Sequence, residues 1–292
     1  MDRRHLECFV AIATSGRMAE AARQLHVSQP ALSQTIKALE QELGIALFHR
    51  LPRGVALTSA GERLLVPARQ MLRDFETLTA QVAAVRGMRT GHVDLMTLPG
   101  LIYDPLARWL GTYRRHWPGI SVRIDLVETP HAVAEAVRTG AAELGLTIDV
   151  SAAEDLATTQ VGHQELVAVF PAGMAGELSA ADISLEELME LRLITGKRGT
   201  LIRDLAEDSA RRRGVQWRPV IEIERRDAAV AFVSAGAGVA VLPQATGELQ
   251  AKELVITRRL RPRIRRPVSL VHRRDALSPA AAALRDVARM HE

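Results

Sequence analysis

The hydrophobic and polar positions of residues 27–43 form two stripes at helical spacing. One stripe is apolar and predicts the buried face of a helix; it consists of Leu32, Ile36, Leu39 and Leu43. The other stripe contains no acidic residue and consists of Gln29, Ser33 and Lys37. Ser28 is the predicted N-cap, Pro30 suits the first turn, and Gly44 predicts the C-terminal end. Such a polar face is either an ordinary solvated surface or one that contacts phosphates and base edges in a major groove.

The segments around this helix favour contact with nucleic acid. Upstream, one apolar stripe predicts a first helix, made by Leu6, Phe9, Val10 and Ala13. Residues 19–25 predict a second, short helix, which His26 and Val27 join tightly to the third. Three short helices in about 40 residues are typical of a helix-turn-helix. Residues 50–57 predict a hairpin or wing, whose Arg50 and Arg53 suit contact with phosphates or a minor groove.

Two stretches of this region carry a family pattern: AARQLHVSQPALSQTIKALEQELGIALFHR at 21–50 and LTSAG at 57–61. With them, the first 65 residues resemble the LysR-type transcriptional regulators. The resemblance implies a winged helix-turn-helix in which Gln29, Pro30 and Ser33 meet bases. From the polar stripe and the wing, we expect Ser28, Lys37, Arg50 and Arg53 to meet phosphates.

The chain departs from the family pattern in three places. Arg17, Met18 and Ala19 stand where Ser-Phe-Thr usually opens the second helix, so that helix loses its hydroxyl cap. Leu51 and Pro52 occupy wing positions where a polar residue is more usual. Met96 stands where family members often have Gly, which alters one wall of the expected effector pocket.

Residues 59–86 predict one long helix of roughly 40 Å. Ser59 with Glu62 forms a candidate capping box, Thr58 is an alternative cap, and Pro67 should loosen the first turns. A heptad seam runs along the helix: Leu64, Ala68, Met71, Phe75, Leu78, Val82 and Val85. A long helix cannot bury such a seam alone, so we expect a homodimer through it, or a tetramer built from such dimers. The alternative is a helix packed on its own effector domain.

From residue 92 onward, predicted strands alternate with predicted helices, and the layout resembles the two-lobed α/β fold of periplasmic binding proteins. The predicted fold class is therefore α+β and multidomain. The expected division is a winged helix-turn-helix at 1–58, a dimerising linker helix at 59–88 and an effector-binding domain at 89–292. Within the last, lobe 1 should comprise about 89–161 and 268–292, and lobe 2 about 162–267.

Ligands of open parallel sheets bind beyond the carboxyl ends of strands, near helix N-termini. This rule selects four loops, and the candidate effector-binding residues in them are Thr97, Pro99, Gly100, Thr129, Thr147, Thr195, Lys197 and Thr200. Thr97 and Thr200 are the preferred pair, one from each lobe. The loop 195–200, TGKRGT, combines hydroxyls, two cations and a helix start, and so suits a carboxylate or a phosphate, unless its cations are only solvated.

Composition narrows the functional classes. The net charge of +4 and a pI near 9.8 are compatible with a polyanionic partner. The single cysteine, Cys8, excludes an intramolecular disulfide and lies beside the apolar stripe of the first helix, where a filler is expected rather than a redox sensor. We find no signal peptide or apolar run of membrane-spanning length, and expect a cytoplasmic protein without membrane contact. Nothing indicates a cofactor, a metal site or an enzyme; the histidines lack ligand spacing, and Gly236 and Gly238 do not form a dinucleotide fingerprint.

The basic run 258–266 has two interpretations: a second DNA contact, or a crossover and edge strand protected by charge and by Pro262. For the whole chain, we expect a regulator that binds double-stranded operator DNA and responds to a small-molecule effector. One alternative is an enzyme or transport-type binding protein with an appended DNA-binding domain. Another is a nucleoid-type binder without a specific operator, against which a ligand-dependent melting temperature would argue.

Overall fold

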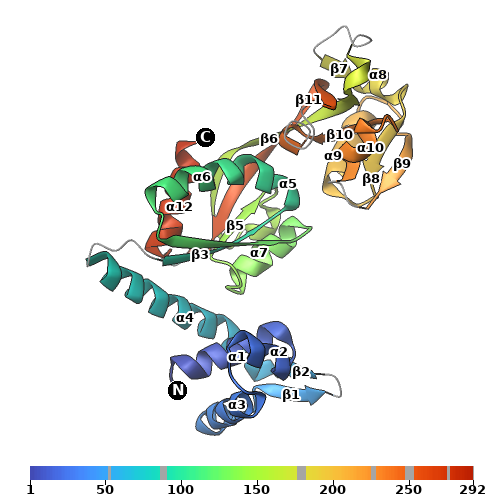
Figure 1. Cartoon of the computed structure of the whole chain (residues 1–292). Helices are drawn as coiled ribbons and strands as arrows, with labels where there is room; N and C mark the ends of the chain where they lie inside the picture. Colours follow the sequence, from blue (N-terminus) through green and yellow to red (C-terminus); the bar gives the residue numbers. More distant parts are fainter. Residues whose placement is uncertain are drawn as a thin grey trace.

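The computed structural model describes residues 1–51, 54–85, 91–175, 182–224, 228–246, 253–274 and 277–291, with only the backbone at 76, 77 and 80–85. A small N-terminal unit is joined by one long helix to a larger two-part α/β unit (Figure 1). The elements of the N-terminal unit and the long helix are α1 (Arg3–Ser15), α2 (Met18–Gln24), α3 (Gln29–Leu43), β1 (Phe48–Leu51), β2 (Gly54–Leu57) and α4 (Ser59–Val85).

The three N-terminal helices form where their local sequence signals predict them. The Ser28 hydroxyl caps α3 by accepting from the Ala31 N–H at 3.3 Å, and Gly44 ends the helix with a φ of 68°. At the start of α2, Arg17 provides no side-chain cap. This is expected, because Arg17 stands where the family usually has a hydroxyl residue. The helices share one core, in which the buried side chains include Leu6, Phe9, Leu32, Ile36, Leu39 and Leu47. Cys8 is a free thiol buried in the same core, and burial raises its pKa, which fits the predicted filler.

The predicted wing is an antiparallel hairpin of β1 and β2, which pair from Phe48↔Leu57 to Leu51↔Gly54. The Glu40 carboxylate of α3 accepts from the backbone N–H groups of Leu47 (2.7 Å) and Phe48 (3.2 Å), so the third helix holds the base of the wing. Gly54 has a φ of 134°, and a Cβ there would lie 2.6 Å from the Gly16 carbonyl oxygen. The wing therefore lies directly against the C-terminus of α1.

The long helix α4 has 27 residues and contains Pro67. Its cap is Thr58, whose hydroxyl accepts from the Gly61 N–H at 3.0 Å, while Ser59 is already helical; the Ser59 capping box is thus wrong and the alternative is right. The side chains of the predicted seam fall into two groups, one buried and one exposed. Ala68 is 1% exposed and, with Leu64, belongs to the N-terminal core, whereas Met71, Phe75 and Leu78 are 41%, 40% and 59% exposed. The side chains of Val82 and Val85 lie outside the described residues.

The C-terminal unit is built on one nine-stranded mixed sheet with the order β4-β3-β5-β11-β6-β10-β8-β9, to which β7 adds by pairing with β11. Its strands are β3 (Gly91–Thr97), β4 (Ile120–Leu126), β5 (Leu144–Thr147), β6 (Ala157–Pro171), β7 (Asp182–Ser184), β8 (Leu193–Gly196), β9 (Pro219–Ile223), β10 (Val239–Pro243) and β11 (Val255–His272). Its helices are α5 (Pro99–Leu101), the π-helical turn η1 (Ile102–Leu106), α6 (Ala107–His116), α7 (Pro130–Arg138), η2 (Ser151–Ala153), η3 (Ala172–Met174), α8 (Leu185–Met189), α9 (Leu201–Arg211), α10 (Ala229–Ser234) and α12 (Pro279–Met290).

Two long antiparallel strands, β6 and β11, run through both halves of this sheet (Figure 1). At one end, β11 pairs with β5 through Ser269–His272, and β3 pairs in parallel with β4 and β5; we call this half lobe 1. At the other end, β6 pairs with β10, and β8 pairs in parallel with β9 and β10; we call this half lobe 2. The final helix α12 packs on lobe 1, as expected.

The long strands correct two expectations from the sequence. The sequence pattern alone predicts separate short strands at 164–170, 253–260 and 268–271, but in the structure these are parts of β6 and β11. The basic run 258–266 lies inside β11, which pairs with β6 on one side and with β7 at Arg259–Arg261 on the other. Residues 259–261 are therefore not at an edge of the sheet, and the run as a whole is part of the strand that crosses between the lobes, as the crossover interpretation predicted. The ladder between β6 and β11 is irregular between Arg259 and Ile264, around Pro262.

The sequence pattern also predicts one helix at 103–116, but in the structure this helix is interrupted. It begins instead with α5 and η1, and Asp104 has non-helical dihedral angles before Pro105 (φ −153°, ψ 130°). Elsewhere, Ser184 and Glu187 form a capping box on α8, and the Ser278 hydroxyl caps α12. No helix within the described ranges is long and apolar enough to span a membrane.

Candidate DNA-binding surface and effector cleft

The outer stripe of α3 is accessible. Gln29 and Lys37 are exposed and Ser33 is half-buried, while the apolar stripe at Leu32, Ile36 and Leu39 faces the core. The side chains of Gln29, Ser33 and Lys37 form no hydrogen bond or ion pair with any residue that the structure describes. Their polar groups therefore remain available to a partner, and they lie within three turns of one helix face.

The remaining predicted DNA-binding residues flank this stripe. Ser28 and Pro30 are exposed at the start of α3, although the Ser28 hydroxyl is already engaged as the cap. Arg50 is exposed on β1, and within the described part of the chain its guanidinium has no partner. Arg53 lies outside the described residues. The short connection between α2 and α3 turns at His26, which has a φ of 53°.

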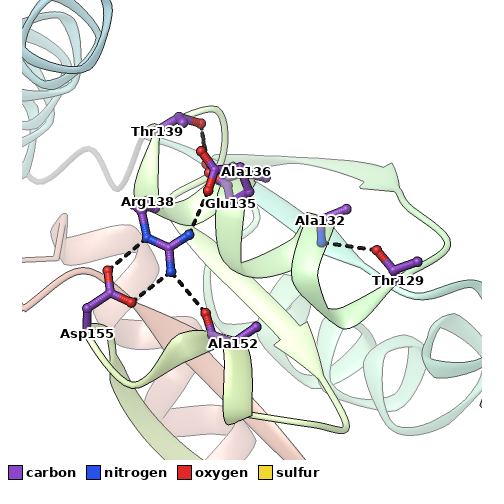
Figure 2. A network of polar contacts seen from close by, with 8 residues as sticks. All are labelled: Thr129, Ala132, Glu135, Ala136, Arg138, Thr139, Ala152 and Asp155. Atoms are coloured by element: carbon purple, nitrogen blue, oxygen red, sulfur yellow. Dashed lines mark hydrogen bonds and ion pairs between the residues drawn. The ribbon is translucent and has the colours of Figure 1, made fainter. Parts of the chain in front are cut away.

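In lobe 1, three of the four predicted effector loops meet at one edge of the sheet, but their hydroxyls are engaged. Thr97 and Thr147 end the neighbouring strands β3 and β5, and both side chains are fully buried. The Thr97 hydroxyl donates to the Leu146 carbonyl at 3.2 Å, and that of Thr147 lies 3.4 Å from the Asp149 carbonyl. Thr129 is exposed and caps α7 by accepting from the Ala132 N–H at 3.2 Å (Figure 2).

Arg138 holds the C-terminal end of α7 in place through hydrogen bonds. Figure 2 shows its guanidinium donating to both oxygens of Asp155, at 2.8 and 2.9 Å, and to the Ala152 carbonyl and the Glu135 carboxylate. These hydrogen bonds from Arg138 lower the pKa of Asp155 to about 2 and raise the pKa of Arg138 itself. The helix that begins at the Thr129 loop is therefore fixed at its C-terminal end.

The fourth loop lies between β8 and α9. Fewer of its polar groups are available to an anion than its composition predicts. Lys197 pairs with Glu224 at 3.0 Å, although both side chains are more than half exposed. Thr200 lies at the N-cap position of α9 but does not cap it; its hydroxyl donates to the Lys197 carbonyl at 2.8 Å. Thr195 is half-buried at the end of β8.

Sequence reasoning missed a pocket of about 540 Å³ at the junction of the two lobes. It is lined by Tyr103, Asp104, His163, Gln164, Glu165, Pro243, Gln244, Ala245 and Arg265. The buried Gln164 donates to the carbonyl of Gly100, one of the predicted residues, at 3.1 Å, and its amide oxygen accepts from Arg266. The only signal for it in the sequence is the polar triplet 163–165 preceding an apolar run.

The helix α4 also contacts lobe 1, as the alternative of a helix packed on its own effector domain implied, but it does so through arginines that the sequence did not single out. Arg69 donates to the Thr139 carbonyl at 3.2 Å and to the Thr14 hydroxyl of α1 at 3.3 Å, so it contacts both the N-terminal unit and the C-terminal end of α7. Arg73 donates to the neighbouring Gly140 carbonyl at 2.7 Å. Burial lowers the pKa of Arg69. Two cations thus meet the negative end of the α7 dipole.

The chain resembles known proteins along nearly its whole length. Residues 3–62 match the family described as bacterial regulatory helix-turn-helix protein, lysR family, and residues 86–292 match the LysR substrate binding domain. The HTH-type transcriptional regulator TfdS of Cupriavidus pinatubonensis is 31% identical over 99% of this chain and 98% of its own. IlvR of Caulobacter vibrioides, also an HTH-type transcriptional regulator, is 30% identical over 97% of this chain and 96% of its own.

Solved structures share the fold. Full-length CbnR complexed with its target DNA aligns with a TM-score of 0.69 and 24% identity over 100% of both chains. A full-length OxyR variant from Pseudomonas aeruginosa aligns with a TM-score of 0.75 and 22% identity, over 99% of this chain and 95% of that one.

Proposed function

Because this chain belongs to the LysR family of DNA-binding transcriptional regulators, which carry an effector-binding domain and are not enzymes, we propose that it reads a specific operator with α3 and the wing under control of an effector held between its lobes. Gln29, Pro30 and Ser33 contact bases, while Ser28, Lys37, Arg50 and Arg53 contact phosphates. The working units are 1–58 for DNA, 59–88 for dimerisation and 89–292 for the effector. A protein that acts on operators works where the chromosome lies, in the cytoplasm.

The observation that carries the DNA-binding proposal is the outer stripe of α3. Three polar side chains project from one accessible face, and no described residue binds them. Glutamine and serine carry both donors and acceptors and can read base edges, whereas a lysine ammonium supplies charge to a phosphate. The accessible guanidinium of Arg50 extends this surface onto the wing.

Dimerisation through α4 is supported by the division of its seam. The N-terminal part of the seam is buried in the core of the chain's own N-terminal unit. Met71, Phe75 and Leu78, however, expose 40% or more of their surface. Three large apolar side chains at heptad spacing on one helix are best covered by the same helix of a second chain. Two-fold symmetry then places two copies of α3 on two half-sites, and dimers of this kind can pair into a tetramer.

The route from effector to DNA runs, in this proposal, along α7. Its N-terminal cap Thr129 lies among the candidate effector loops, and its C-terminal carbonyls accept from Arg69 and Arg73 of α4. Arg69 also reaches Thr14 of α1. An effector that binds one arrangement of the lobes more tightly would shift α7, and through these bonds the angle of the DNA-binding unit.

Gel shifts with wild type and two variants test the assignment of roles on α3. Gln29→Ala should lose preference for the operator over random DNA, because base contacts carry specificity. Lys37→Ala should bind all sequences more weakly and lower the slope of log K against log salt by about 1. If Gln29→Ala kept the full preference, base reading by this residue would be refuted.

A thermal-shift screen of small carboxylates against wild type and Thr200→Val tests the effector proposal. Ligand binding to the folded state raises the melting temperature, and loss of the hydroxyl should reduce the rise. An anionic effector is supported by Lys197 of the TGKRGT loop, whose solvent-exposed pair with Glu224 an anionic ligand can replace. Shifts with neutral compounds but none with anions would refute that charge argument while leaving the DNA-binding role intact.

A further inference from the structure

A second pocket, of about 430 Å³, lies on lobe 2 alone. It is formed by the C-terminal half of α9 and the segment that leads into β9, and is lined by Arg198, Glu207, Arg211, Gly214, Val215, Gln216 and Trp217. None of these residues lines the pocket between the lobes or belongs to the candidate effector residues. The class of ligand that this pocket would bind must therefore follow from its own lining.

Arg198 is the first reason to look for a ligand here. The TGKRGT loop supplies two cations, and the structure separates them: Lys197 pairs with Glu224, whereas Arg198 turns toward this pocket. Arg198 is exposed and binds none of the residues that the structure describes. A guanidinium with all five N–H donors available beside a concave surface can bind an oxyanion through two parallel hydrogen bonds.

Trp217 is the second, independent reason. Its indole Nε1 is buried and has no hydrogen-bond partner among the described residues, while its ring is partly buried against the lobe 2 core. An indole N–H can only donate, and leaving it unpaired away from water is costly. Because the Trp217 ring lines the pocket, a small rotation that exposes Nε1 lets a ligand acceptor atom satisfy this donor at the same time as Arg198.

The charges around the pocket agree with an anion. Arg211 adds a second guanidinium, which is largely exposed and pairs with Asp208 on its own helix. The one carboxylate in the lining, Glu207, accepts from the buried Arg203 at 2.6 Å, and Arg203 shares its charge with Glu222 at 2.8 Å, so the charge of Glu207 is compensated only in part. The lining as a whole presents net positive charge and an indole donor to whatever enters it.

We propose that this lobe 2 pocket is a binding site for a small oxyanion, a carboxylate or a phosphate, separate from the effector cleft. Arg198 supplies the charged pair of hydrogen bonds, Trp217 donates a third, and Arg211 contributes charge at the rim. The site goes beyond the proposed regulatory function and does not depend on it, because all its residues belong to one lobe.

The test uses the full chain and follows its three indole N–H signals by ¹H–¹⁵N NMR, at constant ionic strength, while inorganic phosphate or acetate replaces chloride. Trp217→Phe identifies the Trp217 signal. Trp109 is fully buried in lobe 1, and its Nε1 likewise has no partner among the described residues, so its signal provides the internal reference. We expect a saturable shift of the Trp217 signal and none of the Trp109 signal, with the tighter of the two anions showing which class the pocket prefers.

Arg198→Ala should weaken anion binding about tenfold, because it removes a charge-assisted hydrogen bond. Arg212→Ala is the matched control: it removes the same charge from an exposed neighbour that does not line the pocket, and should leave the affinity unchanged. The proposal would be overturned by a Trp217 signal that does not respond to either anion. Equal losses in the two arginine variants would overturn it as well, because they would mean screening by the overall charge.

Discussion

Replacing Phe75 on α4 should dissociate the dimer. In the single chain Phe75 is 40% exposed. With about 200 Å² for a phenylalanine side chain, covering that part removes roughly 80 Å² from water, or about 2 kcal/mol at about 25 cal/mol per Å². A two-fold symmetric dimer loses this contribution twice, about 4 kcal/mol, so Phe75→Ala should raise the dimer dissociation constant by up to roughly a thousandfold.

Sedimentation equilibrium over a wide range of protein concentration measures this constant directly. Leu254→Ala is a suitable control, because Leu254 is 60% exposed but lies in lobe 2, away from α4. It should leave the constant unchanged, and circular dichroism should show that both variants remain folded. If Phe75→Ala associated as tightly as wild type, the exposed half of the seam would not be the dimer contact.

Three further predictions concern the elements that position the sites. Gly54→Ala should destabilise the N-terminal unit by about 1–3 kcal/mol in denaturant unfolding, because its Cβ would meet the Gly16 carbonyl and its φ of 134° disfavours alanine. Glu40→Ala should cost about 1–3 kcal/mol and weaken DNA binding, since two wing N–H groups lose their acceptor. Asp155 should titrate by NMR near pH 2, so its pair with Arg138 stabilises the fold above the ordinary pKa of 3.8 and is lost as pH falls through about 2; Asp155→Asn should remove that dependence.

The N-terminal unit was predictable from the sequence because its signals are local. The cap Ser28, the stop Gly44 and the apolar stripe between them act within one helix, and each is found where the pattern placed it. The wing was predicted at residues 50–57, next to that helix, and the structure has its hairpin at Phe48–Leu57. Its anchoring by Glu40 was not predicted, since the carboxylate reaches backbone groups seven and eight positions away, which no spacing rule specifies.

Long-range contacts account for most of what the sequence did not predict. The heptad seam was read as continuous, but Ala68 is used by the core of the N-terminal unit, a choice that depends on how α4 meets α1. The strands β6 and β11 were broken into pieces in the prediction, because glycine and proline at Gly162, Pro262 and Pro267 normally end strands. In the fold, these residues lie within strands that continue from one lobe into the other.

The candidate effector site also depends on long-range contacts that the sequence does not specify. The rule for parallel sheets correctly predicted that the Thr97, Thr129 and Thr147 loops lie at one edge of lobe 1, but it could not show that the Thr97 and Thr147 hydroxyls bind backbone carbonyls. The pocket between the lobes draws Asp104, Gln164, Gln244 and Arg265 from four distant segments, and no local pattern joins them. Whether the eight predicted effector residues bind a ligand therefore remains a prediction for the thermal-shift screen.

Selection of DNA from a pool of random duplexes tests the central claim most directly, namely that paired copies of α3 read an operator. Wild type should enrich a sequence with two inverted half-sites, and Gln29→Ala should enrich a degenerate version of it at the positions that this residue reads. Failure of wild type to enrich any sequence, or enrichment of a single unpaired site, would contradict the account.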